Sequence, residues 1–204
     1  LEKRIILEES WKRFLIDNMV YIRGWIQMKK IKYLQDRNPG VPGIIYKLEP
    51  ENEKHRKLQK IRGLWTAVIE MSDIYDIYSG SHIEQNEYEI DHFVPWSFVT
   101  NDEMWNLIPV NPSLNASKRD KLPNWDRYFL SFAQNQFRLN QMVYKYERLA
   151  HIFRECQRDN LNAAWSVEEL YVKNIKNDQF CKVLESRLKP IYELARTQGY
   201  RIWM

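Results

Sequence analysis

One short stretch of the chain brings together side chains with acid–base and metal-binding chemistry. Asp91 and His92 are adjacent, and Asn106, Asn115 and Lys118 follow shortly after them. A neutral imidazole, whose usual pKa is about 6.5, accepts a proton from water near neutral pH. Carboxylate and amide oxygens are hard ligands that suit Mg²⁺ or Mn²⁺ better than zinc. Together, these residue types are suited to phosphodiester hydrolysis, which needs a base to activate water and a cation to stabilise charge around phosphorus.

The local pattern around these residues predicts a compact ββα unit. Residues 88–94 alternate like a short strand, and residues 105–110 form a second apolar, strand-like run. Asn111 followed by Pro112 is a favourable helix start, with Asn as the N-cap and Pro at the first helical position. We expect this short helix to end near residues 121–123.

The predicted unit constrains how the side chains can meet. Neighbouring residues of a strand point to opposite faces, so Asp91 and His92 reach one pocket only if the strand end is twisted or bulged, or if the helix folds across it. Asn115 would face back toward the strand, where it and Asp91 offer two oxygen ligands. Lys118 shares the helix face of Asn115 and could contact a phosphate. Glu89 shares a strand face with Asp91 and could approach the cation, but a solvated position is at least as consistent with its type.

Residues 88–123 resemble the HNH nuclease family, particularly the Asp-His…Asn…Asn variety found in the HNH domains of RNA-guided CRISPR effector nucleases. The first part of the match is Tyr88-Glu-Ile-Asp91-His92-Phe-Val-Pro95-Trp-Ser97-Phe. Asn106 and Asn115 stand at the spacings of that variety, and the run Asn115-x-x-Lys118-x-Asp120-x-Leu-Pro123 fits as well. The resemblance covers less than a fifth of the chain.

The resemblance implies a role for each of these residues. Asp91 and Asn115 would be ligands of Mg²⁺, for which Mn²⁺ can substitute, and His92 would be the general base. Asn106 would act with His92 in the catalytic unit by bracing the ββα fold beside the site. The implied reaction is hydrolysis of DNA with 5′-phosphate and 3′-hydroxyl products. The implied setting is bacterial defence, either as a free-standing enzyme or as the nuclease module of a complex of guide RNA and protein subunits.

Two basic clusters are candidates for contacts with a phosphate backbone. The first consists of Lys54, Arg56, Lys57, Lys60 and Arg62, and the second of Lys118, Arg119, Lys121 and Arg127. Charge runs are usually solvated faces, but converging clusters would bind nucleic acid in a salt-dependent way. Lys118, Arg119 and Lys121 are therefore the substrate-binding candidates. The net charge of +4 neither demands nor excludes such a partner.

The remaining sequence predicts a helical frame. Apolar residues recur at helical spacing over residues 5–36, 51–72 and 125–149, and a further helix or two should cover residues 167–197. Asn38-Pro39-Gly40 should stop the first helix. The expected fold is mostly helical α+β, with a ββα-metal core held between long helices. The expected segments are 1–73, 74–123 and 124–204 within one compact domain. Eight Trp and twelve Tyr residues indicate a large core.

Cysteine usage and hydropathy bear on the compartment. Cys156 and Cys181 have no partner at CxxC spacing, which favours thiols in a reducing compartment and excludes a cysteine zinc site. No apolar stretch approaches membrane-spanning length, and no charged-then-apolar leader precedes the first helix. These features predict a cytoplasmic protein with no membrane partner. The alternative to a nuclease is a nucleic-acid-binding or scaffold module that keeps the HNH fold without cutting.

Overall fold

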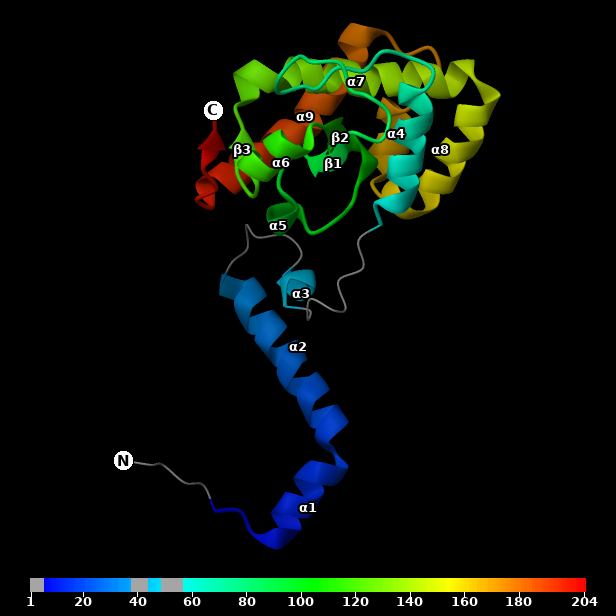
Figure 1. Ribbon diagram of the computed structural model, residues 1–204. Coiled ribbons are helices and arrows are strands. Elements are labelled where there is room, and N and C mark those ends of the chain that lie inside the picture. Colours follow the sequence, from blue (N-terminus) through cyan, green and yellow to red (C-terminus); the bar gives the residue numbers. More distant parts are fainter. Residues whose placement is uncertain (1–5, 38–43, 49–56) are drawn as a thin grey trace. The chain divides into compact units, whose positions relative to one another are not determined.

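The computed structural model describes residues 6–37, 44–48 and 57–204 (Figure 1). The chain divides into two compact units, residues 1–49 and residues 50–204. The second unit contains the whole ββα region together with the helices that follow it. The boundaries expected after residues 73 and 123 stay a prediction.

The first unit contains α1 (Glu9–Asp17), α2 (Met19–Arg37) and α3 (Ile44–Lys47). The continuous helix predicted over residues 5–36 is interrupted at Asn18, whose backbone leaves helical geometry at φ −108° and ψ 13°. The backbone amide and the side-chain amide of Asn18 both donate to the Phe14 carbonyl, at 3.1 and 2.9 Å. The helix stop predicted at residues 38–40 lies outside the described residues, as does the Val41–Gly43 segment.

The second unit begins with α4 (Gln59–Ile69), which covers only part of the helix predicted over residues 51–72; residues 51–56 lie outside the described part of the chain. The ββα unit follows. Its strands β1 (Glu89–His92) and β2 (Leu107–Val110) pair antiparallel, with Asp91 opposite Ile108 and His92 opposite Leu107. The connection between them contains the short helix α5 (Trp96–Val99) and the turn η2 (Met104–Asn106).

The helix of the ββα unit, α6 (Pro112–Lys118), starts where the sequence predicts. The Asn111 side chain accepts a hydrogen bond from the Ser113 amide, and Pro112 follows it at the first helical position. The helix ends at Lys118 rather than near residues 121–123. Arg119 adopts a positive φ of 50°, and the chain then enters a short strand instead of continuing the helix.

Helices form most of the remaining chain. In order, the elements are β3 (Leu122–Pro123), α7 (Trp125–Lys145), α8 (Glu147–Asn160), the π-helical turn η3 (Ser166–Leu170), α9 (Asn177–Thr197) and β4 (Ile202–Trp203). The strand β4 returns to pair parallel with β3, a contact that the sequence analysis does not foresee. The expected mostly helical α+β fold is confirmed.

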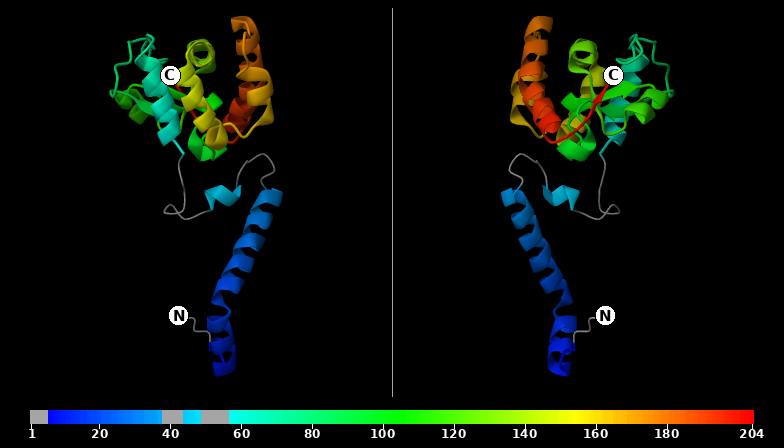
Figure 2. Two further views of the ribbon diagram at one scale, coloured as in Figure 1. Left: turned by 90° about the vertical axis from the view of Figure 1, so that its right-hand side faces the viewer. Right: turned by 90° about the vertical axis from the view of Figure 1, so that its left-hand side faces the viewer.

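The core of the second unit surrounds the ββ hairpin. Helix α6 packs against β1, whereas α4 and α7 pack against β2. Figures 1 and 2 show α4 alongside α8, and α7 alongside α9, so the hairpin is enclosed by helices from both flanks of the sequence. At the centre Phe93 packs against Phe132, with ring centroids 4.4 Å apart. None of the described helices combines the length and hydropathy required to cross a bilayer.

Candidate active site

Asp91 is a nearly buried carboxylate with hydrogen bonds on both oxygens. Its Oδ2 accepts from the Tyr78 hydroxyl at 2.7 Å, and its Oδ1 accepts from Lys118 Nζ at 3.0 Å. Lys118 also donates to the His92 carbonyl at 2.8 Å, and its side chain is fully buried. A buried charge needs a partner of opposite charge or strong hydrogen bonds, and Asp91 has both.

Tyr78 is held in place by its surroundings. Its ring lies edge-on to Tyr128 and Trp203, with centroid distances of 5.1 and 4.9 Å. Burial, and then the nearby Asp91 charge, raises the pKa of the Tyr78 hydroxyl well above its usual value. The hydroxyl therefore keeps its proton and acts as a donor to Asp91.

The loop that carries Tyr78 is organised by another buried carboxylate, Asp76. Its Oδ1 accepts from the amides of Tyr78 and Ser79 at 2.7 and 2.8 Å, and its Oδ2 accepts from the Asn111 amide. Gly80 closes the turn at a positive φ of 74°, a conformation that a glycine adopts without strain. Asp76 thus ties the Tyr78 loop to the first residue before α6.

His92 faces a different set of partners from Asp91, as expected for neighbours on a strand. Its Nε2 lies 3.0 Å from Asp102 Oδ1 and 3.2 Å from the Asn101 carbonyl oxygen. The side chains of His92 and Asp102 are only 5% and 6% exposed. The pair is therefore a buried interaction between β1 and the connection that leads to β2.

Asn115 lies on α6 and reaches the strand face that carries Asp91. Its Nδ2 donates to Glu89 Oε2 at 2.7 Å, and Glu89 and Asp91 share a face because they are two residues apart on β1. Glu89 is exposed and Asn115 is partly buried. The predicted approach of the helix to the strand is therefore present, and it places carboxylate and amide oxygens on one side of the hairpin.

Carboxylate and amide oxygens are donors that fit Mg²⁺ or Mn²⁺. The Lys118 ammonium beside Asp91 indicates that this carboxylate already lies where a positive charge is favoured. Among the described residues, no cluster of three or more His, Cys, Asp or Glu side chains is arranged to hold a metal ion, a criterion that does not include amide ligands such as Asn115. The assignment of Asp91 and Asn115 as metal ligands stays a prediction.

Asn106 is fully buried and makes two hydrogen bonds to one peptide segment. Its Nδ2 donates to the Val94 carbonyl at 2.9 Å, and its Oδ1 accepts from the Val94 amide at 2.8 Å. The side chain thus extends the β1–β2 ladder past His92, where the strand ends. These are the contacts of a bracing residue, and a part for Asn106 in catalysis stays a prediction.

The basic residues near α6 differ in what they offer to a substrate. Lys118 was expected to contact phosphate, but its ammonium is buried against Asp91 and is not presented at the surface. Its polar end packs inward because the buried carboxylate requires a counter-charge. Arg119, Lys121 and Arg127 are exposed. Phosphate binding by Arg119 and Lys121 remains compatible with their positions.

The other basic cluster is partly engaged within the protein. Lys60 Nζ lies 2.6 Å from an oxygen of Asp159, which raises the pKa of Lys60 and lowers that of Asp159. Lys57 approaches the same carboxylate at 3.8 Å. Arg62 donates to the Tyr88 carbonyl at 3.1 Å. Lys54 and Arg56 lie outside the described residues, so convergence of the two clusters stays a prediction.

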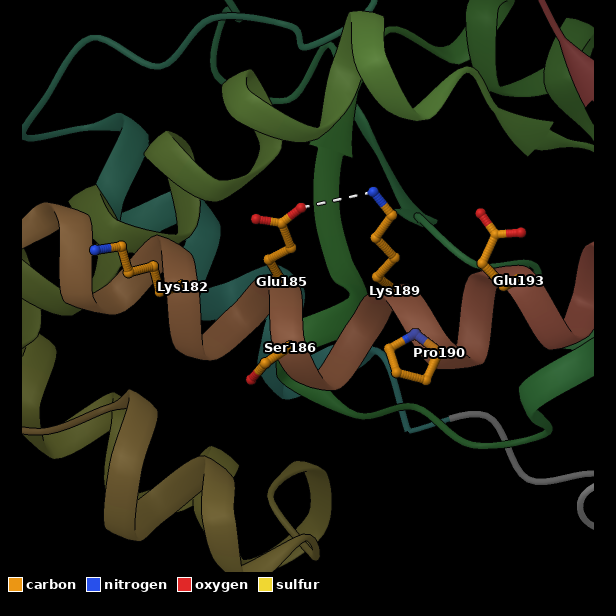
Figure 3. A pocket seen from close by; sticks show the side chains of 6 residues that line it. All are labelled: Lys182, Glu185, Ser186, Lys189, Pro190 and Glu193. Carbon is orange, nitrogen blue, oxygen red and sulfur yellow. Dashed lines mark ion pairs between the residues drawn. The ribbon is translucent and has the colours of Figure 1, made fainter.

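An open hollow of about 530 Å³ runs along α9 (Figure 3). It is lined by Lys182, Glu185, Ser186, Lys189, Pro190 and Glu193. Figure 3 shows that these side chains come from a single helix, with Glu185 and Lys189 forming an ion pair at 3.8 Å. The hollow shares no residue with the ββα unit, so it is separate from the candidate active site.

Three residues of the site were missed by the sequence analysis. Asp76 and Tyr78 precede β1 in a segment without a distinctive pattern, and Asp102 is one acid in a ten-residue connection. Their contacts with Asn111, Asp91 and His92 form only when the chain folds, so spacing along the sequence carries no signal for them.

Comparison with known proteins identifies one family. The model of the HNH endonuclease family matches residues 76–124, a segment that begins at Asp76 and contains β1, β2 and α6. No curated protein and no solved structure matches the chain at a significant level. The match includes Asp91, His92, Asn106 and Asn115, and it also includes Asp76, Tyr78 and Asp102.

Proposed function

We infer that this protein is a metal-dependent endonuclease, because residues 76–124 belong to the HNH endonuclease family. The observation that carries the inference is the contact between Asn115 and Glu89 at 2.7 Å. It joins α6 to the face of β1 that bears Asp91.

Asp91 and Asn115 are the residues that would hold the divalent cation, and Glu89 lies close enough to assist them. When bound, Mg²⁺ or Mn²⁺ supplies positive charge that stabilises the phosphorus oxygens and the leaving oxygen. Lys118 forms a buried ion pair with the same Asp91 carboxylate, which lowers the free-energy cost of burying that charge. Tyr78 fixes the orientation of Asp91 through its hydroxyl.

His92 is the residue that accepts the proton of the attacking water. Asn106 supports His92 through hydrogen bonds to the backbone amide and carbonyl of Val94, two residues further along the chain. The exposed cations Arg119 and Lys121 follow α6 directly and would contact the phosphate backbone of the substrate. These contacts are independent of base sequence, so they contribute affinity without sequence preference.

The finer features of the proposal rest on the likeness of the Asp-His…Asn…Asn motif to guided effector nucleases. We take the substrate to be DNA and the products to carry 5′-phosphate and 3′-hydroxyl ends. The proposed setting is bacterial defence in the cytoplasm, either as a free-standing enzyme or as the nuclease subunit of a complex with guide RNA. The two isolated cysteines support a reducing compartment.

The test is incubation of the purified protein with supercoiled plasmid in Mg²⁺, in Mn²⁺ and in EDTA. We expect nicking or linearisation in both metals and none in EDTA. His92→Ala should abolish cutting while DNA binding persists. His82→Ala is the matched control, because His82 is an exposed histidine paired with Asp73 and Glu84 and should leave cutting unchanged. Cutting by His92→Ala at the parental rate would refute the assignment.

A second candidate is a nucleic-acid-binding module that does not cut. The observation that favours it is the burial of the two central groups, since Asp91 is 6% and His92 is 4% exposed. Such a module would bind plasmid equally well in Mg²⁺ and in EDTA. Metal-dependent strand breakage would exclude it.

A further inference from the structure

Two groups that can only accept a hydrogen bond lie within reach of His92 Nε2. One is the Asp102 carboxylate at 3.0 Å, and the other is the Asn101 backbone carbonyl at 3.2 Å. A backbone carbonyl has no proton to donate at any pH. In the neutral imidazole, one nitrogen carries the proton and the other carries a lone pair. In a neutral His92, these two contacts favour the proton on Nε2 and the lone pair on Nδ1.

Asp102 is itself fixed by two other parts of the fold. Its Oδ2 accepts from the Lys57 amide at 2.7 Å, and its backbone carbonyl accepts from Asn160 Nδ2 at 2.7 Å. The same Asn160 nitrogen donates to the Lys57 carbonyl at 2.9 Å, and Asn160 is fully buried at the end of α8. Asp102 is therefore held between Lys57, which precedes α4, and Asn160, the last residue of α8.

We propose that Asp102 is a positioning residue that fixes the tautomer and ring orientation of His92, so that Nδ1 is the nitrogen that accepts the proton of water. The proposal rests on the proposed function of His92 as general base. The helical frame then has a specific task, because Asn160 of α8 and Lys57 before α4 hold Asp102 within hydrogen-bond distance of His92. A general base is effective only when its lone pair is directed at the water that it activates.

Asp102→Ala removes the carboxylate acceptor. Asp102→Asn keeps the size of the side chain but has a single acceptor oxygen, which cannot serve both His92 Nε2 and the Lys57 amide. Glu103→Gln is the matched control. Glu103 is the next residue, is 5% exposed, and also connects the loop to the helical frame, through Asn162 and Trp105. A purely structural role for acids in this loop would make the Ala and Gln variants behave alike.

The first readout is the imidazole ¹⁵N signals of protein labelled at histidine, recorded over a series of alkaline pH values at which the signals no longer change. The chain has four histidines, so His92→Gln assigns the signals of His92 by their loss. We expect the parent and Glu103→Gln to show a proton on Nε2. Asp102→Ala should show a measurable population with the proton on Nδ1.

The second readout is the rate of plasmid cutting. Groups that orient a metal-bound imidazole typically contribute roughly tenfold to hundredfold in activity, and we take the same scale for His92. We expect a loss of this size in kcat for Asp102→Ala, and near-parental rates for Glu103→Gln after correction for folded fraction.

The outcomes separate this proposal from the proposed function. If Asp102→Ala keeps the parental tautomer, positioning by Asp102 is refuted even if His92→Ala abolishes cutting. Equal changes in Asp102→Ala and Glu103→Gln would refute it as well, because both acids would then act only on folding. If the parent does not cut DNA, the ¹⁵N signals still decide whether Asp102 sets the tautomer of His92.

Discussion

Two opposite charges meet in the interior at the end of β1. The Asp91 carboxylate and the Lys118 ammonium lie 3.0 Å apart, with side chains 6% and 0% exposed. Neither group would be stable there alone, because removing one partner of a buried pair leaves an uncompensated charge. A cation that binds Asp91 performs the same electrostatic task as Lys118. Lys118 and a cation bound at this site would therefore share one carboxylate.

This arrangement predicts the behaviour of Lys118→Met, which removes the charge and keeps the length of the side chain. In EDTA we expect the free energy of unfolding to fall by about 3–5 kcal/mol, because Asp91 loses its buried counter-ion. In Mg²⁺ the deficit should be smaller, because a bound cation restores positive charge beside Asp91. Urea denaturation under both conditions measures the difference.

Lys121→Met is the control for that experiment, since Lys121 is exposed and should change stability by no more than about 0.5 kcal/mol. An identical deficit for Lys118→Met in Mg²⁺ and in EDTA would show that no cation is bound at Asp91.

Residue types and spacings predicted only part of the site. The sequence placed Asp91, His92, Asn106 and Asn115 in one short motif, because each lies on or beside an element that local patterns define. Burial of Lys118 was not predictable, since an exposed lysine has the same helical spacing. The Asp102 contact depends on Asn160, which is far away in the sequence and close only in the folded chain.

The start of α6 controls where Asn115 lies relative to β1. The Asn111 Oδ1 accepts from both the amide and the hydroxyl of Ser113, at 2.9 and 2.7 Å. Asn111→Ala should therefore lower the free energy of unfolding by about 1 kcal/mol, as is typical for loss of an N-cap. It should also slow plasmid cutting, because a frayed first turn shifts the helix that carries Asn115.

Asn124→Ala provides a matched comparison on another helix. Asn124 caps α7 by accepting from the Arg127 amide at 3.0 Å, and α7 carries none of the proposed catalytic or metal-binding residues. We expect a similar loss of stability and no specific loss of cutting. Equal losses of cutting in the two variants would mean that α6 has no special part in the reaction.

The two ends of α6 show why element boundaries were only partly predictable. Its start follows from residue types, an asparagine cap followed by proline, and these act locally. Its end depends on a tertiary contact, because residues 122–123 pair with β4, which is distant in the sequence. The break between α7 and α8 was not predictable in the same way. The apolar period runs through it unchanged, although the backbone is extended at Tyr146, where α7 ends and α8 begins.

At the scale of the whole molecule, the core joins the ββα unit to its helical frame. Cys156 on α8 is fully buried in the same apolar cluster as Phe93 and Leu107. Burial raises the pKa of its thiol to about 12, from an ordinary value of 9.0. The thiol therefore resists alkylation and ionisation for as long as the core is intact.

The raised pKa of Cys156 should change how the free energy of unfolding depends on pH above pH 9. In the unfolded chain the thiol ionises as pH rises through 9.0, whereas in the folded protein it keeps its proton until about pH 12. The unfolded state is therefore favoured increasingly above pH 9, by up to about 1.4 kcal/mol per pH unit from this group. Below pH 9 the contribution is constant. Cys156→Ala should lose this part of the slope, although a small cavity lowers its stability at every pH.

Urea denaturation of the reduced protein between pH 8 and pH 10.5 measures the slope for the parent, Cys156→Ala and Cys181→Ala. Cys181 is the control, because its thiol is partly exposed and its pKa is raised less. We expect the slope above pH 9 to be clearly shallower in Cys156→Ala and little changed in Cys181→Ala. If all three proteins show the same slope, the α8 face that carries Cys156 is open to solvent.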